Sequence, residues 1–329
     1  MADAATEAEA RIDAASAARP MRVPIIDAVR GVALAAMVVY HFAWDLRFFG
    51  YIAVDVAADP GWRIFARIIA GTFLALVGVG LVFSVRNGFR IDRFLRRLAL
   101  VGGAAVAITL ATWFAFPDAY IFFGILHAIA LFSVLGLPFA RAPILIVIAL
   151  ALFCFIAPSV LAGPVLDHPA LVWLGLSRIP PHSNDFVPLF PWFGVVLGGI
   201  AAAGLAVRFW PAGRALPASA APRALVWAGR NSLAIYLIHQ PLLFGLVYFA
   251  AQVAPPEPIG FATWHRDSCT RQCVDSGAGE ASCQSTCACL TERSEAEGLA
   301  APLLANNLDE AQVSRYFELA GQCRRAPPP

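Results

Sequence analysis

The stretch Ile25–Phe49, IIDAVRGVALAAMVVYHFAWDLRFF, is apolar and long enough to cross a lipid bilayer as one helix. Besides Arg47 near its end, four ionisable residues interrupt it: Asp27, Arg30, His41 and Asp45. At about 100° and about 1.5 Å per residue, Arg30 and His41 fall on one stripe of the helix, about 16 Å apart. An ionisable group at membrane depth costs about 2.5–3.5 kcal/mol, so we expect these residues to face the protein interior and to serve a reaction path or a transport path.

The composition of the whole chain favours an integral membrane protein. Hydrophobic residues make up 59% of its 329 residues, charged residues only 14%, and the mean hydropathy is +0.69, which exceeds what a soluble core can use. Apolar runs of about 20 residues indicate spans. They predict an all-α, polytopic protein with about seven transmembrane helices, at 25–45, 62–84, 99–116, 119–139, 143–163, 187–206 and 229–253.

Arginines mark one side of the predicted membrane domain. The loop after the second span contains Arg86, Arg90, Arg93, Arg96 and Arg97, and the loop before the last span is also rich in arginine. A patch for anionic lipid is one interpretation of the first loop, but retention of positive charge on the inner side is sufficient. We therefore predict a multi-pass protein of the bacterial inner membrane, in contact with lipid, with its N-terminus inside and its C-terminus outside.

Three segments follow from these patterns. Residues 1–21 are polar and rich in alanine, which predicts a disordered cytoplasmic tail. Residues 22–254 form the membrane domain, and residues 255–329 form a polar, cysteine-rich tail in the periplasm.

Six cysteines crowd into that tail: Cys269, Cys273, Cys283, Cys287, Cys289 and Cys323. An even number of clustered cysteines is typical of disulfides in an oxidising compartment, which is the side chosen by the arginine count. The first four are spaced as two i, i+4 pairs, which predicts a stapled helical hairpin with Cys289 and Cys323 as a possible third bridge. A zinc site is the alternative, but the spacings and the lack of paired histidines favour disulfides, and we predict no metal.

Four segments carry a resemblance to a known family. The string IDAVRGVALAAMVVYHFAWDL resembles the opening helix of bacterial membrane proteins grouped with the catalytic domain of heparan-alpha-glucosaminide N-acetyltransferase. The segments FPDAYIFFGILHAIAL, PLFPWFGVVLGGI and GRNSLAIYLIHQPLL follow in the family's order, so that the resemblance covers nearly all of 22–250. The spacing of Arg30 and His41 is also similar to the Arg-x10-His signature of the wider membrane acyltransferases that acylate sugars, where that pair is held to be essential.

The resemblance implies a membrane acyltransferase. Its donor would be acetyl-CoA or another acyl-CoA in the cytoplasm, and its acceptor a hydroxyl or amine of a glycan or aminosugar at the outer face. His41 would act as general base and Asp45 would orient its ring. Arg30 would bind a CoA phosphate or the pantetheine carbonyl, and Asp27 would hold Arg30.

The loop that follows the first predicted span departs from the family pattern. In the eukaryotic enzyme that names the family, the active histidine is thought to lie in this loop, whereas GYIAVDVAADPGWR contains none. Either His41 replaces that histidine, or the chemistry differs, or this branch is not a transferase of that type.

Further polar or aromatic residues in or near the predicted spans are weaker candidates for contacts with substrate, and each has a structural alternative. An isolated histidine on an apolar helix is often a satisfied interior group, a histidine beside proline binds carbonyls freed by the kink, and a tryptophan near a helix end belongs to an interfacial belt. The candidates are His127, His239, Tyr236, Trp192, Arg230 and His182.

Two other function classes stay open. Histidine and aspartate inside a membrane can relay protons in a transporter. A non-catalytic scaffold whose cysteine-rich tail binds a partner is the third class. We expect no nucleic-acid partner, and the sequence makes no prediction of the oligomeric state, the acceptor or the bond that is formed.

Overall fold

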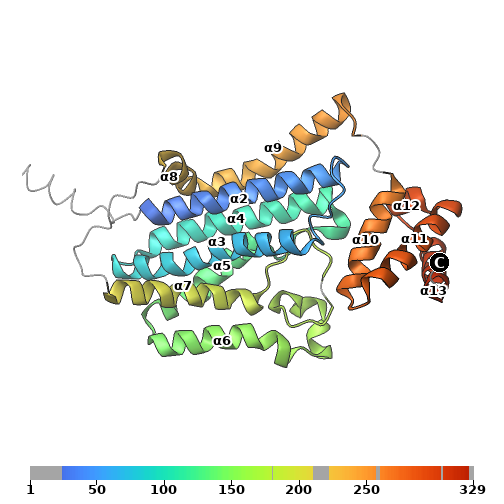
Figure 1. Cartoon of the computed structure of the whole chain (residues 1–329). Coiled ribbons are helices and arrows are strands. Elements are labelled where there is room, and N and C mark those ends of the chain that lie inside the picture. Colours follow the sequence, from blue (N-terminus) through green and yellow to red (C-terminus); the bar gives the residue numbers. More distant parts are fainter. Residues whose placement is uncertain (1–23, 180, 210–221, 257–259, 305–306, 326–329) are drawn as a thin grey trace, which may run out of the picture. The chain divides into compact units, whose positions relative to one another are not determined.

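The computed structural model describes residues 24–179, 181–209, 222–256, 260–304 and 307–325. These residues form helices joined by turns and loops (Figure 1), and the only β-type pairing among them is one isolated bridge between Phe123 and Phe186. The fold is therefore all-α, as the sequence predicts. The predicted N-terminal tail, 1–21, lies outside the described residues.

Within the described residues, six helices are long and apolar enough to cross a membrane. Their apolar side chains point outward as well as inward: Phe114 is 83% exposed and Leu145 is 78% exposed. Outward apolar side chains suit a helix that meets lipid. Such a helix also satisfies its backbone hydrogen bonds within itself. The six are α2 (Pro24–Phe48), α3 (Pro60–Arg86), α4 (Ile91–Ala115), α6 (Ile144–Leu161), α7 (Leu189–Phe209) and α9 (Ser232–Val253).

The fourth predicted span, 119–139, is shorter in the structure than expected. Its helix, α5 (Ile125–Gly136), has 12 residues. At about 1.5 Å per residue it extends about 18 Å, against the roughly 30 Å of a bilayer core. The apolar run is interrupted because the chain is extended at Gly124, just before α5, and Pro138 opens a short 3-10 turn after the helix.

Two other boundaries also differ from the prediction. Helix α4 begins at Ile91 and not at 99, because the arginine-rich segment before the apolar run is helical as well. The last predicted span is broken near its start: a short helix, α8 (Arg223–Arg230), ends at Asn231, and α9 begins at Ser232. Short 3-10 turns complete the loops, namely η1 (Pro117–Ala119), η2 (Pro138–Arg141), η3 (Pro164–Asp167) and η4 (Pro169–Leu174).

The chain divides into two compact units. The first consists of Met1–Val38 and Ile64–His239, and the second of Val39–Arg63 and Gln240–Pro329. Helices α2 and α9 each contribute their first part to the first unit and their last part to the second.

Close packing of helices builds the core of the first unit. Helix α6 packs along α7, and α4 packs along α5 (Figure 1). Helices α3 and α7 approach each other at two glycines: a side chain at Gly78 would overlap the carbonyl of Val196, and one at Gly199 would overlap the carbonyl of Ala75. Small residues at such crossings let two backbones meet inside a membrane, where water does not drive association.

In the second unit, the last turns of α2 meet the last turns of α9. The ring centroids of Phe49 and Phe244 are 4.8 Å apart, and the hydroxyl of Tyr51 donates a 2.7 Å hydrogen bond to the carbonyl of Ala254. These contacts hold the loop after α2 against the end of α9.

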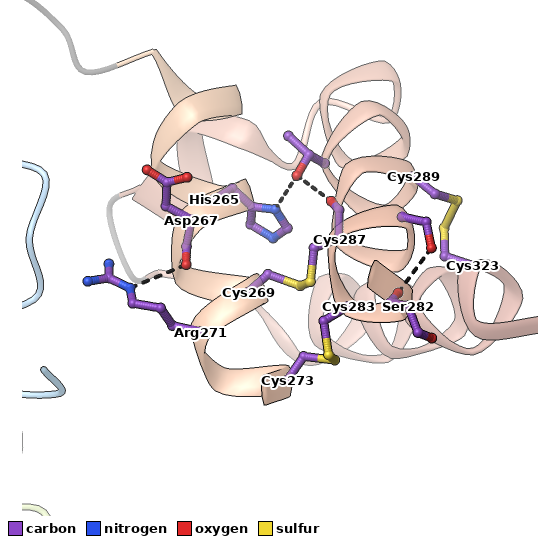
Figure 2. The surroundings of a disulfide bond; sticks show 12 residues. His265, Asp267, Cys269, Arg271, Cys273, Ser282, Cys283, Cys287, Cys289 and Cys323 are labelled. Atoms are coloured by element: carbon purple, nitrogen blue, oxygen red, sulfur yellow. Dashed lines mark hydrogen bonds between the residues drawn. A yellow bond between two sulfur atoms is a disulfide. The ribbon is translucent and has the colours of Figure 1, made fainter. Parts of the chain in front are cut away.

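The cysteine-rich tail of the second unit is helical and cross-linked. Its helices are α10 (Phe261–Asp275), α11 (Glu280–Ala296), α12 (Ala300–Leu304) and α13 (Glu310–Arg325). Two bridges staple α10 to α11 and a third joins α11 to α13 (Figure 2), namely Cys269 to Cys287, Cys273 to Cys283, and Cys289 to Cys323. This is the helical hairpin with a third bridge that the cysteine spacings allow.

Candidate functional site

A cluster of charges lies at the first turns of α2. Asp27 sits between two arginines: its Oδ1 accepts from Nη1 of Arg30 at 3.3 Å, and its Oδ2 accepts from Nε of Arg230 at 3.3 Å. Nη1 of Arg30 also lies 3.5 Å from the carbonyl oxygen of Gly229. One carboxylate thus faces two guanidinium groups, and the cluster keeps a net positive charge.

Glycines let α8 bring Arg230 to this cluster. A Cβ atom at Gly31 of α2 would overlap the carbonyl of Leu225, and one at Gly229 of α8 would overlap the carbonyl of Asp27. The two backbones therefore touch, which only glycine permits at these positions.

A cavity of about 390 Å³ lies between α3, α4 and α5, and arginines at the start of α4 and just before it line it. Its basic lining residues are Arg90, Arg93 and Arg97. Ser84, Asn87 and Ser133 add hydrogen-bonding groups. Arg97 is also close enough to Arg30 for the two positive charges to repel each other. Arginine is the residue best suited to phosphate, since its planar donors bind two oxygens at once.

Asp45 lies near the other end of α2 and is fully buried. Its Oδ1 accepts a hydrogen bond of 2.8 Å from Nε2 of Gln240, a residue of α9. Within the described part of the chain, Oδ2 of Asp45 and Oε1 of Gln240 are buried without a hydrogen-bond partner. Burial of two such acceptors costs free energy unless a donor reaches them.

His41 lies one turn before Asp45 on the same face of α2 and is half-buried. Its ring meets the ring of Tyr40 edge to face, with centroids 5.6 Å apart. The roles predicted for His41 and Asp45 as base and orienting residue stay predictions.

His127 has a structural partner on each ring nitrogen. Nδ1 accepts from the backbone N–H of Gly124 at 3.3 Å, which leaves the proton of the neutral ring on Nε2. Nε2 lies 3.2 Å from Oγ1 of Thr109, which in turn donates to the carbonyl of Ile121 at 2.7 Å. His127 therefore ties the start of α5 to α4.

Asp185 completes this corner from a distant loop. Its Oδ2 accepts from the backbone N–H of Ile125 at 2.7 Å, so it caps α5, whose preceding residue Gly124 has no side chain. A Cβ at Gly124 would collide with that carboxylate, so glycine is required there. Burial raises the pKa of Asp185 to about 6, against the lowering effect of the hydrogen bond from Ile125. Tyr236 lies within electrostatic range of Asp185.

The remaining candidates are spread over the fold. His239 is buried, and its Nδ1 lies 2.8 Å from the carbonyl of Tyr236 on its own helix. Trp192 packs partly buried against the core of the first unit. His182 is exposed in the loop before α7, with Nδ1 3.0 Å from the carbonyl of Asp118. The structure thus groups Asp27, Arg30 and Arg230, and it groups His127 with the corner that holds Asp185 and Tyr236.

Three contributors to these clusters are not among the candidates predicted from the sequence. They are Gln240, Asp185 and the arginines that line the cavity, which the sequence indicates only as a mark of the inner side. A glycine before a helix that needs a cap was the one local sign of a distant partner such as Asp185. Among the described residues, no group of three or more His, Cys, Asp or Glu is arranged to hold a metal ion.

Comparison with known proteins gives one family. Residues 22–241 match the model of the family described as heparan-alpha-glucosaminide N-acetyltransferase, catalytic. No curated protein and no solved structure gives a significant match. The matched range contains every cluster described above and ends before the cysteine-rich helices.

Proposed function

The chain belongs to the family of the heparan-alpha-glucosaminide N-acetyltransferase catalytic domain, and from this membership we propose that it is an acyl-CoA-dependent membrane acyltransferase. It moves an acetyl or other acyl group from cytoplasmic acyl-CoA to a hydroxyl or an amine of a saccharide at the outer face of the bacterial inner membrane.

The arrangement of positive charge is the observation that carries this proposal. Arg30 and Arg230 share the single carboxylate of Asp27, and the cavity lined by Arg90, Arg93 and Arg97 lies in the same unit. Such an excess of guanidinium groups suits the phosphates of CoA. A neutral substrate would not need this positive charge. The side of the membrane predicted for these arginines is the side where acyl-CoA is found.

Helix α2 supports a reaction that crosses the membrane. Arg30 lies in its second turn, and Asp45 lies near its last turn, about 22 Å further along the axis. In the proposed mechanism, the phosphates bind at the arginine end, and the acceptor reaches the end that carries His41 and Asp45. The pantetheine arm brings the thioester between them.

The acyl transfer itself needs one base. The imidazole of His41 takes the proton from the attacking hydroxyl or amine as its oxygen or nitrogen bonds to the acyl carbon. Asp45 orients the ring and stabilises the imidazolium. The carbon–sulfur bond of the thioester then breaks, and the CoA sulfur leaves with the proton from His41, so that the products are acylated saccharide, CoA thiol and neutral histidine.

An acyl-transfer assay tests this proposal. Purified protein is incubated with radiolabelled acetyl-CoA and a panel of glycans and aminosugars, and label transfer and CoA release are measured. We expect transfer by the natural protein and its loss in His41→Ala and in Arg30→Ala, with normal membrane insertion of both. His168→Ala is the matched control, because this histidine lies in an exposed loop where it caps η4. Full activity of His41→Ala would contradict the mechanism.

Donor binding is tested separately from turnover. Arg93→Gln and Arg97→Gln should weaken acetyl-CoA binding by about tenfold or more each, since a charge-assisted hydrogen bond contributes about 1.5–3 kcal/mol. Arg208→Gln is the control, because Arg208 is exposed at the end of α7 and does not line the cavity. Equal losses in all three variants would point to a general effect of charge and against a phosphate site.

A proton-coupled transporter is the second candidate. The buried carboxyl of Asp45 inside a span favours it, because such groups commonly mark proton paths. Absence of acetyl-CoA binding in folded protein, together with uptake that depends on a proton gradient, would favour this function over acyl transfer.

A further inference from the structure

Two neighbouring side chains, one near the end of α2 and one in α9, leave oxygen atoms unused. Gln240 donates one N–H to Oδ1 of Asp45 at 2.8 Å. Oδ2 of Asp45 and Oε1 of Gln240 are both buried, and neither has a hydrogen-bond partner among the described residues. Each unused oxygen is bonded to the same carbon as one atom of that hydrogen bond, so the two oxygens lie near each other. Both residues belong to the second unit.

The carboxyl group of Asp45 is fully buried and needs a positive charge beside it. Arg47 does not supply that charge, because two residues turn a helix by about 200°. Its guanidinium lies instead over the ring of Trp264, with Cζ 5.7 Å from the ring centroid. His41 shares the face of Asp45 one turn earlier, but a neutral imidazole carries no charge. A carboxylate oxygen has two lone pairs, so Oδ2 can meet both this ring and a cation.

The unused atoms define the kind of cation. Both are oxygens, which favour a hard cation over a soft one. One carboxylate balances one positive charge, so a monovalent ion leaves the pair neutral inside the membrane, where a net charge is costly. Calcium gathers about 6–8 oxygens, and magnesium keeps a nearly ideal octahedron with several waters. Two oxygens that lie near each other suit the smaller sodium ion better than potassium.

We infer that Asp45 and Gln240 bind a sodium ion, with Oδ2 and Oε1 as two of its ligands and water as the others. The hydrogen bond between the two side chains holds the carboxylate and the amide oxygen in place for the ion. Because Asp45 lies in α2 and Gln240 in α9, the ion joins two membrane helices. This site goes beyond the proposed acyl transfer and does not depend on it, since sodium is neither the donor nor the acceptor.

Thermal unfolding of the full-length protein in detergent tests the inference, with sodium chloride as the probe. Choline chloride at the same concentration controls for ionic strength, because choline is too bulky for two close oxygens. Sodium should raise Tm in a saturable way, by about 2 °C or more at about ten times its Kd, since it binds only the folded state. Potassium should need a concentration about tenfold higher. Equal values of Tm in sodium and choline would overturn the inference.

Variants locate the ion at the pair. Asp45→Asn keeps the shape of the side chain without its charge and should abolish the difference between sodium and choline. Gln240→Met removes Oε1 and should raise the sodium concentration of half effect by about tenfold or more. Gln252→Met is the control, because Gln252 is exposed on the same helix, and it should keep the natural response. A full sodium response in Asp45→Asn would overturn the inference.

Direct binding of radioactive sodium to the natural protein covers the case in which a variant does not fold. Scintillation proximity should show saturable binding of about one ion per chain, displaced by unlabelled sodium and not by choline. Its absence would overturn the inference.

A proton shared by Oδ2 and Oε1 is the competing occupant. It predicts that acid stabilises the protein and that sodium has no effect, and this result would overturn the sodium site. The outcome for acyl transfer is separate. Sodium binding without transfer from acetyl-CoA would support the ion site and reject the acyltransferase, whereas transfer without sodium binding would do the reverse.

Discussion

Nδ1 of His265 lies 2.8 Å from Oγ1 of Thr291, and this pair fixes the protonation of a buried histidine. The hydroxyl of Thr291 donates to the carbonyl of Cys287 at 2.6 Å, so its oxygen accepts the proton of Nδ1. Nε2 then accepts from the hydroxyl of Tyr316 at 2.8 Å. The chain of bonds places a neutral histidine beside a disulfide that staples α10 to α11 (Figure 2).

Acid should loosen the cysteine-rich helices through His265. Burial lowers the pKa of this histidine below its ordinary 6.5. The unfolded chain therefore binds a proton more readily than the folded one, so stability is complete above about pH 6.5 and declines as the pH falls below it. The hydrogen-exchange protection factors of the amides of α10 and α11, from which the intrinsic pH dependence of exchange is removed, should fall as the pH is lowered from 7.5 to 5. His265→Phe should lower the free energy of unfolding of these helices by about 1–3 kcal/mol at neutral pH, but the variant should lack the extra sensitivity to acid. If the acid effect persists in this variant, the explanation is refuted.

The three disulfides should contribute unequally. The bridge from Cys289 to Cys323 closes a loop of 34 residues, and the one from Cys273 to Cys283 closes a loop of 10. On loop entropy alone, the longer loop contributes roughly 4 kcal/mol to the stability of the fold and the shorter one roughly 3 kcal/mol. The bridge from Cys273 to Cys283 contributes less still while the bridge from Cys269 to Cys287, which encloses it in the sequence, is intact. We expect the variant with serine at both Cys289 and Cys323 to lose more hydrogen-exchange protection in α11 than the variant with serine at both Cys273 and Cys283. The reverse order would show that local contacts outweigh loop closure.

Gly31 should not tolerate a side chain. A methyl group there would overlap the carbonyl of Leu225 and push α8 away from α2. Gly31→Ala should cost about 1–3 kcal/mol in thermal stability, in the range of other overpacked sites. It should also weaken acetyl-CoA binding, since Arg230 would move from Asp27. Gly71→Ala is the control, because nothing lies within 4 Å of the place that its methyl group would take, and a similar loss there would remove the argument.

Labelling of single cysteines should settle the predicted sidedness. A membrane-impermeant maleimide added to intact cells should label Ala57→Cys, in the loop after α2, and should label Asn87→Cys only after permeabilisation. The background should be low, because Cys154 is buried and free while the six cysteines of the tail are bridged. The opposite pattern would put the arginine cavity outside and exclude acyl-CoA as its ligand.

Hydropathy and helical spacing account for most of the fold. Except at the start of α4, they locate the long helices within a few residues, because each helix satisfies its own backbone and presents apolar side chains outward. They fail at α5, where Gly124 and Pro138 limit a continuous apolar run to a short helix. They fail again at Asn231, where α8 ends and α9 begins, since composition alone does not reveal a break between two helical segments.

The site is less accessible to such reasoning. The contact of Asp27 with Arg30 follows from their spacing of three residues on one helix. The contacts of Asp27 with Arg230 and of Asp45 with Gln240 do not, because helical periodicity gives the face of each helix and not the helix opposite. For the same reason the cavity of Arg90, Arg93 and Arg97 appears only once three helices are assembled.

These two contacts also set an order of events during synthesis. Asp27 precedes Arg230 by 203 residues, and Asp45 precedes Gln240 by 195. At about 5–20 residues per second, the first membrane helix leaves the ribosome roughly 10–40 seconds before α8 and α9, which supply the two partners. Until then the carboxyl groups of Asp27 and Asp45 lack those partners, and a chain that stops before α8 never acquires them. The polar contacts of the first membrane helix are therefore completed only near the end of the synthesis of the membrane domain.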